Sequence, residues 1–484
     1  MPTSSKIVLF LLFLVLSAAA SLGQAANTQL FELHIQSMST PWPTIGFNNV
    51  RLFSNTSGNV TRWSSINTGP TTYNWTVLDS WLADLYTHGI TDGVFYTFDQ
   101  VPPWASSNNT DSACDFASGG NNGGCDLPTD INIDGTGTDQ DYINFITAIA
   151  QRVNNPAYLN GTAPFTQKHA HIKYWEPWNE VYRNSVVSTH SWGTYSIRAS
   201  YAQLVRMAED LRCTITGTGS ILGTSCSATP IDSTALIVSP SDGSTPALSP
   251  GSTMVFQNFL YCNGTGANAP IAGSYCTTGS QGSAAVDVIN THFYEAAPEN
   301  LATDVPTYQA YLSSTDLAKP MWSGEGSWGN DTNVSTDPDM QASWVARYYL
   351  VGWSTALVRM YWYAYDSTLY GTLWTSGSGL LAPGTAYGTV HNWIVGSTLT
   401  RNCAVVAGTV WTCSLTLASG FNAVAVWDTS QTCSNSSGSE VCTFSTQTIS
   451  NAWTKYEDLT GTDHTISPLG SVNVGIEPIL LKTR

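Results

Sequence analysis

Two short segments of the chain carry residues suited to acid–base and nucleophilic chemistry. Tyr174–Glu180 reads YWEPWNE, and Met321–Trp328 reads MWSGEGSW. Each places one glutamate, Glu180 or Glu325, at the end of a strand-like run rich in tryptophan, in a chain with only 34 acidic residues among 484. Two such carboxylates can break a glycosidic bond when one is protonated and the other is ionised. The sequence therefore predicts a catalytic pair, provided that the fold brings the two motifs together.

Residues next to these glutamates differ in what they are expected to do. Gly324 and Gly326 flank Glu325, and we expect them to leave it open to a ligand. Glu176 lies on the same face of its strand as Glu180, but about 13 Å lower at the rise of an extended strand. We therefore expect Glu176 to be a buried structural carboxylate that pairs with a basic residue, and only Glu180 to be catalytic.

Three further candidates keep two interpretations each. His292 is equally compatible with a substrate contact and with a hydrogen-bonded core histidine. Asp99 follows a strand-like segment and can line a sugar subsite, although any loop of such a fold can carry an aspartate there. Trp328 can serve as a platform for a sugar ring or as part of the core.

Strand-like and helix-like segments alternate after the first 25 residues, which is typical of a parallel α/β fold. The strand-like segments are Phe31–Ile35, Val50–Ser54, Gly93–Phe98, Ile172–Trp178, Ala235–Ser239, Val286–Tyr294, Met321–Gly324 and Val358–Tyr363. The amphipathic helical segments include Val77–Thr87, Asp139–Val153, Tyr195–Leu211, Thr253–Leu260, Tyr308–Leu312 and Pro338–Ser354. Eight strands with helical crossovers predict a (β/α)8 TIM barrel over residues 27–391. A doubly wound sheet would normally show a glycine-rich phosphate turn after an early strand, and the sequence has none.

The barrel would place both motifs in one site. Residues at the carboxyl ends of barrel strands form the active sites of such folds. By this count Glu180 follows the fourth strand and Glu325 ends the seventh. Because those ends lie across one barrel mouth, the two carboxylates are expected to face each other.

A different pattern begins at about Asn392. Helical periodicity stops, and short β-type runs are separated by turns of Gly, Asn and Ser. These runs are Ala404–Val410, Thr412–Leu417, Ala423–Trp427, Glu440–Ser445, Trp453–Asp458 and Val472–Leu481. We expect a small antiparallel β-sandwich domain over residues 392–484, packed against the barrel.

The motifs resemble those of clan A glycoside hydrolases, and most nearly those of glycoside hydrolase family 39. The resemblance extends from about Trp42 to Asp366. It rests on the two glutamate motifs and on the runs Val50–Phe53, Tyr73–Trp75 with Leu78-Asp79, Tyr96–Phe98 and Pro102–Ala105. Members of the family usually have proline after the Asn-Glu pair, where this chain has Val181. That residue takes no part in proton transfer, so the difference weakens the family placement more than the mechanism.

The resemblance implies a role for each matching residue. Glu180 would be the general acid/base and Glu325 the nucleophile of a retaining glycosidase. The other implied roles are a contact of Asn179 with the sugar 2-hydroxyl, a contact of Tyr294 with the nucleophile, an ion pair of Arg51 with the nucleophile, and a sugar-subsite floor formed by Trp362. It implies no metal and no organic cofactor. The sugar remains open among β-xylosides, other β-glycosides, arabinose-containing sugars and internal polysaccharide bonds.

Several features indicate an exported protein. Lys6, the apolar run Ile7–Leu16 and the small residues that follow are typical of a secretory signal peptide, which we place at residues 1–25. Ten cysteines, an even number without metal-type spacing, predict disulfides. Pairing between neighbours would join Cys114 with Cys125, Cys213 with Cys226, Cys262 with Cys276, Cys403 with Cys413 and Cys433 with Cys442. N-glycosylation sequons lie at Asn55, Asn59, Asn74, Asn108, Asn160, Asn263, Asn330, Asn333 and Asn435.

Charge and composition narrow the partners. The formal net charge is −17 with only 17 basic residues, which argues against nucleic acid as a partner. No segment after the signal is long and apolar enough to predict a membrane helix. The 18 tryptophans and 22 tyrosines are suited to stacking on sugar rings as well as to a core. The expected partner is thus an oligo- or polysaccharide. The main alternative is a catalytically inactive carbohydrate-binding surface protein, which would have no need to keep both carboxylates.

Overall fold

Eight parallel strands form the centre of the molecule in the computed structural model. The structure describes residues 26, 28–53, 61–112, 122–181, 197–241, 252–261, 281–329, 336–355, 357–436, 439–468 and 470–483. The predicted signal segment therefore lies outside the described residues. The eight central strands are β1 (Phe31–Leu33), β2 (Arg51–Leu52), β5 (Val94–Thr97), β6 (Ile172–Glu176), β9 (Leu236–Ile237), β10 (Ile289–Tyr294), β11 (Met321–Ser327) and β12 (Leu357–Trp362). Each of them falls on a predicted strand, which confirms all eight segments.

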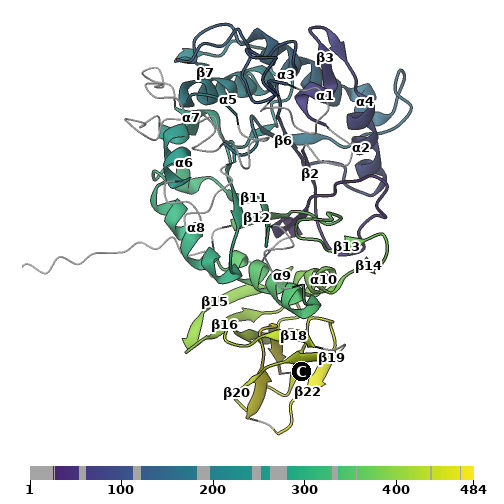
Figure 1. Cartoon of the computed structure of the whole chain (residues 1–484), viewed down its shortest axis with the longest axis vertical. Coiled ribbons are helices and arrows are strands. Elements are labelled where there is room, and N and C mark those ends of the chain that lie inside the picture. The colour runs from purple at the N-terminus through teal and green to yellow at the C-terminus, as the bar shows by residue number, and fades with distance from the viewer. Residues whose placement is uncertain are drawn as a thin grey trace, which may run out of the picture.

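These strands form two four-stranded parallel sheets. Their orders are β1-β12-β11-β10 and β2-β5-β6-β9. Single parallel bridges, Leu33 with Val50 and Val238 with Val288, connect the sheets at both edges. The strand order around the centre is therefore the order expected of a barrel, although each joint is one bridge rather than a continuous ladder. Figure 1 shows the resulting ring, with helices around it.

The helices of this region lie close to the predicted segments. The α-helices are α1 (Trp63–Ile66), α2 (Thr76–Thr87), α3 (Gln140–Val153), α4 (Pro156–Asn160), α5 (Tyr201–Thr216), α6 (Ser252–Tyr261), α7 (Gly282–Ala285), α8 (Leu301–Ala310), α9 (Pro338–Trp353) and α10 (Ala382–Ile394). The short 3-10 helices are η1 (Thr28–Leu30), η3 (Pro298–Asn300) and η4 (Asp316–Ala318). Two-stranded hairpins are formed by β3 (Asn67–Gly69) with β4 (Thr72–Tyr73), β7 (Ser220–Ile221) with β8 (Thr224–Ser225), and β13 (Trp374–Thr375) with β14 (Gly379–Leu380).

Two helix starts differ from the prediction. α5 begins at Tyr201 rather than Tyr195, because Ser200 and Gln203 form a capping box in which each side chain binds the other's backbone N–H. α8 covers Leu301–Ala310, whereas the predicted helix began at Tyr308. Pro306 inside α8 made the earlier start hard to recognise, because proline is unfavourable within a helix.

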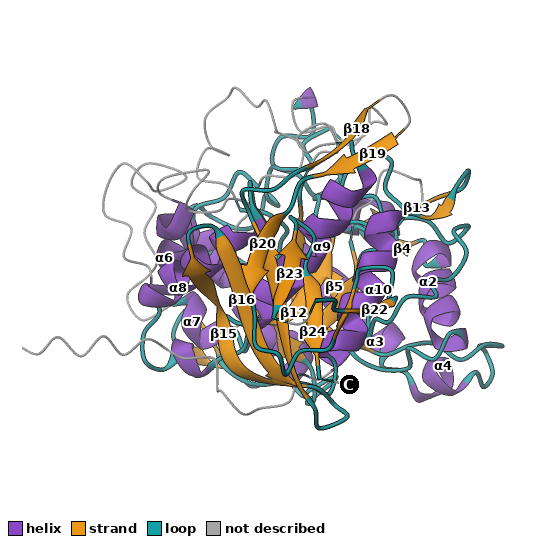
Figure 2. Cartoon of the chain, turned by 90° about the horizontal axis from the view of Figure 1, so that it is seen from below, coloured by secondary structure: helices purple, strands orange, loops and turns teal. Residues whose placement is uncertain are grey.

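The strands after α10 are antiparallel. Six of them form one sheet in the order β15 (Thr398–Ala407), β16 (Val410–Thr416), β17 (Asn422–Asp428), β24 (Ile479–Lys482), β21 (Lys455–Glu457) and β22 (Asp463–Thr465). Two further pairs are β18 (Cys433–Ser436) with β19 (Ser439–Cys442), and β20 (Ser445–Thr448) with β23 (Ser471–Val474). Figure 1 shows these strands below the ring, next to α9 and α10, and Figure 2 shows the same sheet from below. Leu415, Ala425 and Trp427 join the core of the parallel-strand region, whereas Val426 and Leu481 belong to a separate small core.

Three of the expected disulfides are present in the described part of the chain. Cys213 is bonded to Cys226, Cys403 to Cys413 and Cys433 to Cys442. Cys125 is also disulfide-bonded. Cys114, Cys262 and Cys276 lie outside the described residues.

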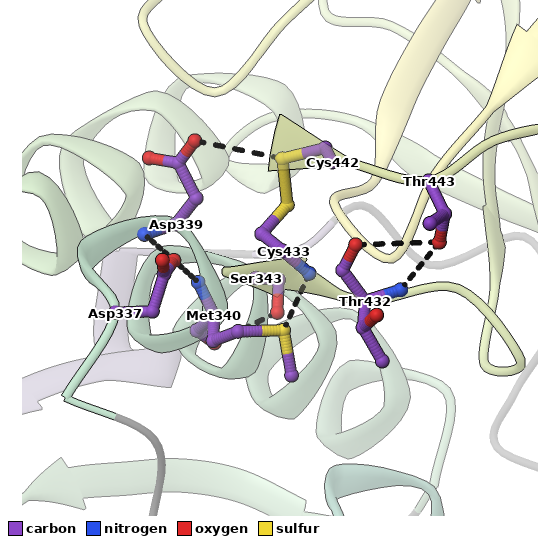
Figure 3. The surroundings of a disulfide bond; sticks show 8 residues. All are labelled: Asp337, Asp339, Met340, Ser343, Thr432, Cys433, Cys442 and Thr443. Atoms are coloured by element: carbon purple, nitrogen blue, oxygen red, sulfur yellow. Dashed lines mark hydrogen bonds between the residues drawn. A yellow bond between two sulfur atoms is a disulfide. The ribbon is translucent and has the colours of Figure 1, made fainter. Parts of the chain in front are cut away.

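The Cys433–Cys442 bond joins the two strands of the β18–β19 hairpin, which lies beside the start of α9. The Cys433 amide donates a hydrogen bond to the Met340 sulfur at 3.3 Å. Asp337 caps α9 by accepting from the amides of Asp339 and Met340 (Figure 3). The hairpin and the helix that follows β11 are thus held together.

Among the described helices, none is long and apolar enough to cross a membrane.

Candidate active site

Arg51 lies at the centre of the candidate site, and its side chain is fully buried. It is on β2, and its guanidinium donates to four acceptors from other parts of the chain. Nη1 donates to Glu325 Oε1 at 2.6 Å. Nη2 donates to Glu176 Oε2 at 2.6 Å and to Asn179 Oδ1 at 2.8 Å, and Nε donates to Thr97 Oγ1 at 2.8 Å. The two glutamate motifs therefore meet at one guanidinium, whose planar set of N–H groups fixes the directions of its partners.

Glu325 lies on β11 and receives hydrogen bonds on both carboxylate oxygens. Arg51 donates to Oε1, and the hydroxyl of Tyr294 donates to Oε2 at 2.6 Å. Close packing explains the flanking glycines, which were expected to leave Glu325 open to a ligand. A Cβ at Gly324 would overlap the Asn290 amide, and one at Gly326 would overlap the Tyr348 hydroxyl. The glycines are needed for close packing beneath Glu325.

Glu180 follows β6 in an uncommon backbone conformation. Its φ is +46°, in the left-handed region that side chains other than glycine seldom adopt. Ser241, just after β9, holds this turn: its Oγ accepts from the Glu180 amide at 2.9 Å, and its carbonyl accepts from the Val181 amide at 2.8 Å. The Glu180 carboxylate lies 2.8 Å from Nδ1 of His292. Both the backbone and the side chain of Glu180 are thus fixed.

Strand β10 contributes alternate residues to the site. Asn290 donates from Nδ2 to Glu176 Oε1 at 3.0 Å. His292 reaches Glu180, and Tyr294 reaches Glu325. Successive side chains of a strand alternate between faces, so residues two apart point the same way. One strand therefore supplies a polar partner to each of three carboxylates, and His292, which is fully buried, is part of the site.

The two candidate catalytic carboxylates are close together. One oxygen of Glu180, one of Glu325 and a ring nitrogen of His292 all lie within 4.8 Å of one another. Burial raises the pKa of Glu325, and the nearby Glu180 raises it further, whereas His292, Arg51 and Tyr294 act in the opposite direction. The lowering by Arg51 that the sequence predicts is thus present, but burial outweighs it. Two carboxyls this close titrate as a pair, which favours a state with one proton between them.

The same three donors are of the types that bind metal ions. A second group of donors, Asp339, Cys433 and Cys442, includes two cysteines that are bonded to each other. Their sulfurs are therefore not available as thiolates. Acid–base chemistry between two carboxyls uses no metal, so the geometry of the first group is explained without one.

Glu176 lies nearer to the site than a continuous strand would place it. β6 ends at Glu176, so the strand rise does not apply between Glu176 and Glu180. One guanidinium nitrogen of Arg51 contacts both Glu176 and Asn179. The estimate of about 13 Å assumes an extended strand up to Glu180, whereas β6 ends at Glu176. Glu176 is buried and paired with a basic residue, as predicted, but that residue is Arg51 of the site itself.

The two predicted tryptophans lie elsewhere. Trp362 is fully buried, and its ring packs among Trp328, Trp344 and Tyr348, with centroids 5.2 to 5.8 Å away. Its indole N–H donates to the Gly371 carbonyl. Trp328 is 3% exposed in the same cluster. Both rings therefore belong to the core, and the expectation that Trp362 floors a sugar subsite does not hold.

Tyr363, the next residue after β12, lies beside the candidate site. Its ring lies against those of His34 and Tyr294, with centroids 4.9 and 6.5 Å away. Its hydroxyl accepts from the Gln36 amide at 3.2 Å. Tyr363 and Gln36 were both missed from the sequence. The signal that could have found Tyr363 is the two-residue period of a strand, which places it on the same face as Arg359 and opposite to Trp362.

Two further residues, His34 and the candidate Asp99, are buried polar residues of the same region. His34 Nε2 is 3.0 Å from the Gly324 carbonyl, next to Glu325 in the chain. Burial, together with the charge of Arg51, lowers the pKa of His34 well below its usual value, so this ring is neutral. Asp99 is 1% exposed. Whether Asp99 lines a sugar subsite stays a prediction.

Comparisons with known proteins give a likeness of fold. No protein-family model matches the chain, and no curated relative matches it. Among solved structures, it is similar to a family 39 glycoside hydrolase from the gut symbiont Bacteroides cellulosilyticus WH2, with 13% identity, a TM-score of 0.56, and 95% of this chain and 81% of that chain covered. It is also similar to a glucosidase from Croceicoccus marinus, with 10% identity, a TM-score of 0.51, and coverage of 95% and 98%. The structural neighbours are thus glycoside hydrolases of clan A, with family 39 among them, and at these identities the likeness is one of fold.

Proposed function

We propose that the protein is a retaining O-glycosidase that cleaves β-glycosidic bonds in oligo- or polysaccharides. The observation that carries this proposal is the pair of carboxylates Glu180 and Glu325, with oxygens within 4.8 Å of each other. Retaining enzymes place their carboxyl groups about 5–5.5 Å apart, whereas inverting enzymes leave about 6.5–9.5 Å for a water. The spacing therefore supports the retaining reaction.

The reaction follows from the partners of each carboxylate. Glu325 attacks the anomeric carbon as Glu180 donates its proton to the leaving glycosidic oxygen. Glu180 then removes a proton from a water, which displaces Glu325 and frees the sugar. Arg51 and Tyr294 hold Glu325 in the orientation for attack, and His292 orients Glu180. Asn179, fixed through Oδ1 by Arg51, directs its amide nitrogen to the sugar 2-hydroxyl.

The proposal includes the architecture and location of the protein. The eight parallel strands close into a (β/α)8 barrel, which the bridges at both sheet edges support. Residues 392–484 form a β-sandwich domain. The protein is exported after removal of residues 1–25 and is glycosylated where its source modifies sequons. Three disulfides in the described residues support an extracellular location.

Hydrolysis of aryl β-glycosides tests the function. The panel should include xylosides, glucosides and arabinosides, and NMR of the first-formed sugar anomer should show retention. Glu180→Gln should lower kcat/KM about 10²–10⁴-fold for substrates with poor leaving groups, and much less for activated ones, because only the former need the proton. Glu325→Gln should abolish turnover of every substrate.

A matched control is Glu32→Gln. Glu32 is another fully buried strand glutamate and pairs with Arg359 at 2.7 Å, and in the described part of the chain it forms no hydrogen bond or ion pair with a site residue. This variant should keep the wild-type response to leaving groups. If wild type hydrolyses nothing in the panel yet binds oligosaccharides, the protein is a carbohydrate-binding protein and the proposal is wrong.

A further inference from the structure

A single buried carboxylate connects the two catalytic glutamates. Glu176 is fully buried, and four donors contact its two oxygens. Oε2 accepts from Arg51 Nη2 and from Thr97 Oγ1, both at 2.6 Å. Oε1 accepts from the Ser241 amide at 2.8 Å and from Asn290 Nδ2 at 3.0 Å. These donors come from β2, from β5, from the segment after β9, and from β10, so Glu176 gathers parts of both sheets.

One of these contacts leads to the nucleophile. The guanidinium that binds Glu176 through Nη2 binds Glu325 through Nη1. Because the guanidinium is planar and rigid, fixing Nη2 also fixes the direction in which Nη1 points. The position of Glu325 Oε1 is therefore set in part by Glu176.

Another contact leads to the general acid/base. Ser241, whose amide donates to Glu176, accepts from the amides of Glu180 and Val181. Those two hydrogen bonds hold the backbone of Glu180 at φ +46°. Such a conformation is unfavourable for glutamate and persists only when its surroundings impose it. Through Ser241, Glu176 thus also helps to hold the backbone of Glu180.

On the basis of the glycosidase function proposed above, we propose that Glu176 is a positioning residue for both catalytic carboxyls. It acts on Glu325 through the Arg51 guanidinium and on Glu180 through Ser241. It makes no contact with substrate and transfers no proton. Its negative charge also determines how much of the Arg51 charge acts on Glu325.

The negative charge of Glu176 should change the pKa of Glu325 in a direction that can be measured. Arg51 is one cation shared by two carboxylates, Glu176 and Glu325. If Glu176 is made neutral, the full field of the guanidinium acts on Glu325 and favours its ionised form. A unit charge a few ångströms away in a protein interior changes a pKa by on the order of one unit. The acidic limb of kcat/KM, which reports ionisation of the nucleophile in the free enzyme, should therefore move to lower pH.

Glu176→Gln tests this charge effect, with Glu176→Asp as the charge-preserving comparison. In Glu176→Gln the acidic limb should move down by about one pH unit. In Glu176→Asp the rate should fall through lost geometry, but the limb should stay where it is in wild type. Glu32→Gln controls for the loss of a buried barrel glutamate and should leave the limb in place. A role in stability alone would lower kcat/KM equally at every pH, and that result would overturn the proposal.

Ser241→Ala tests the second route without touching a charge. Each oxygen of Glu176 accepts two donors, so a glutamine there places its NH2 against a donor, and Ser241→Ala keeps the proposal testable if Glu176→Gln does not fold. Ser241→Ala removes only the acceptor for the Glu180 amide. Turnover of substrates with poor leaving groups should fall about tenfold or more, with little effect on activated ones. Equal losses on both substrate types would contradict the route through Ser241. If wild type is active and Glu325→Gln is inactive, but none of the effects above is seen, the positioning role of Glu176 is refuted. The proposed glycosidase function would still stand.

Discussion

At the scale of single residues, the hydroxyl of Tyr294 should help to keep Glu325 ionised, against the burial that raises its pKa. It donates to Oε2 at 2.6 Å and lowers the pKa of this buried carboxyl. Tyr294→Phe removes that donor, so the pKa of Glu325 should rise and the acidic limb of kcat/KM should move to higher pH. A hydrogen bond to a charged group contributes about 1.5–3 kcal/mol, so kcat/KM should fall about 10- to 100-fold. The pH dependence of aryl glycoside hydrolysis measures both effects.

Tyr96→Phe is the matched control for this prediction. Tyr96 is fully buried on β5, and its hydroxyl donates at the same distance, 2.6 Å, but to the Thr61 carbonyl. Both variants lose one buried tyrosine hydroxyl, and only Tyr294→Phe should shift the limb. A limb that stays in place in Tyr294→Phe would mean that this hydroxyl does not stabilise the ionised nucleophile.

The residues that the sequence could locate are those at the ends of predicted strands. Glu180 and Glu325 could be placed because carboxyl ends of parallel strands meet at one edge, whereas Arg51 and Tyr294 were placed by the family resemblance. Contacts that depend on where a strand stops could not be derived. The role of Ser241 follows from the left-handed turn at Glu180, and no local pattern in the sequence encodes that turn.

At the scale of elements, His171 connects the starts of three strands below the site. It precedes β6, and its Nδ1 lies 2.6 Å from Asp92 Oδ1, just before β5. Its Nε2 lies 2.9 Å from Asp232 Oδ2, before β9. A protonated ring can donate at both nitrogens. Burial acts to lower the pKa of His171, but Asp232 and Asp92 outweigh it and raise the pKa. Partial burial would raise the pKa of Asp232, but His171 and Thr234 lower it to about 2.

The contribution of His171 to stability should depend on pH. Because its folded-state pKa is raised, the contribution is complete below its unfolded pKa of about 6.5 and is lost as the pH rises through the folded value. Asp232 acts in the opposite sense: its contribution is complete above about pH 3.9 and is lost as the pH falls towards its folded value. His171→Gln should therefore lose about 1 kcal/mol more unfolding free energy at pH 5.5 than at pH 9, a modest value because Asp92 is largely exposed. Urea unfolding at the two pH values measures the difference, and a pH-independent loss would refute the pairing.

Whether a segment forms a helix or a strand could be predicted better than which of its side chains face the site. The eight strands follow from apolar runs separated by turns and by amphipathic helices. β12, by contrast, is buried on both faces along most of its length, so its sequence has no polar alternation to show which side faces the barrel mouth. That ambiguity explains why the prediction named Trp362, whose ring is fully buried, and missed Tyr363, whose ring lies next to that of Tyr294. The start of α5 was readable in principle, because Ser200 and Gln203 have the spacing of a capping box.

At the scale of the whole molecule, the C-terminal sheet and the barrel region share a core. Leu399 of β15, Leu415 of β16 and Trp427 of β17 belong to the same apolar cluster as the barrel strands. Polar contacts cross the same boundary. The Trp427 indole donates to Glu299 Oε1 at 2.7 Å, and Arg347 of α9 donates to the same oxygen at 3.0 Å. Glu299 follows β10, the strand that carries His292 and Tyr294. The C-terminal sheet therefore supports the segment that follows the site.

This shared core predicts that the two regions unfold together. Trp427→Ala should cost about 3–5 kcal/mol, because a fully buried tryptophan leaves a cavity and Glu299 loses a donor. Its stacking neighbour Trp411, which is only partly buried, is the control, and Trp411→Ala should cost much less. In both variants near-UV circular dichroism and glycosidase activity should report one coincident urea transition. A C-terminal sheet that folds independently would instead lose its signal first while activity persists. Coincident transitions would mean that the site depends on strands that contribute no residue to it.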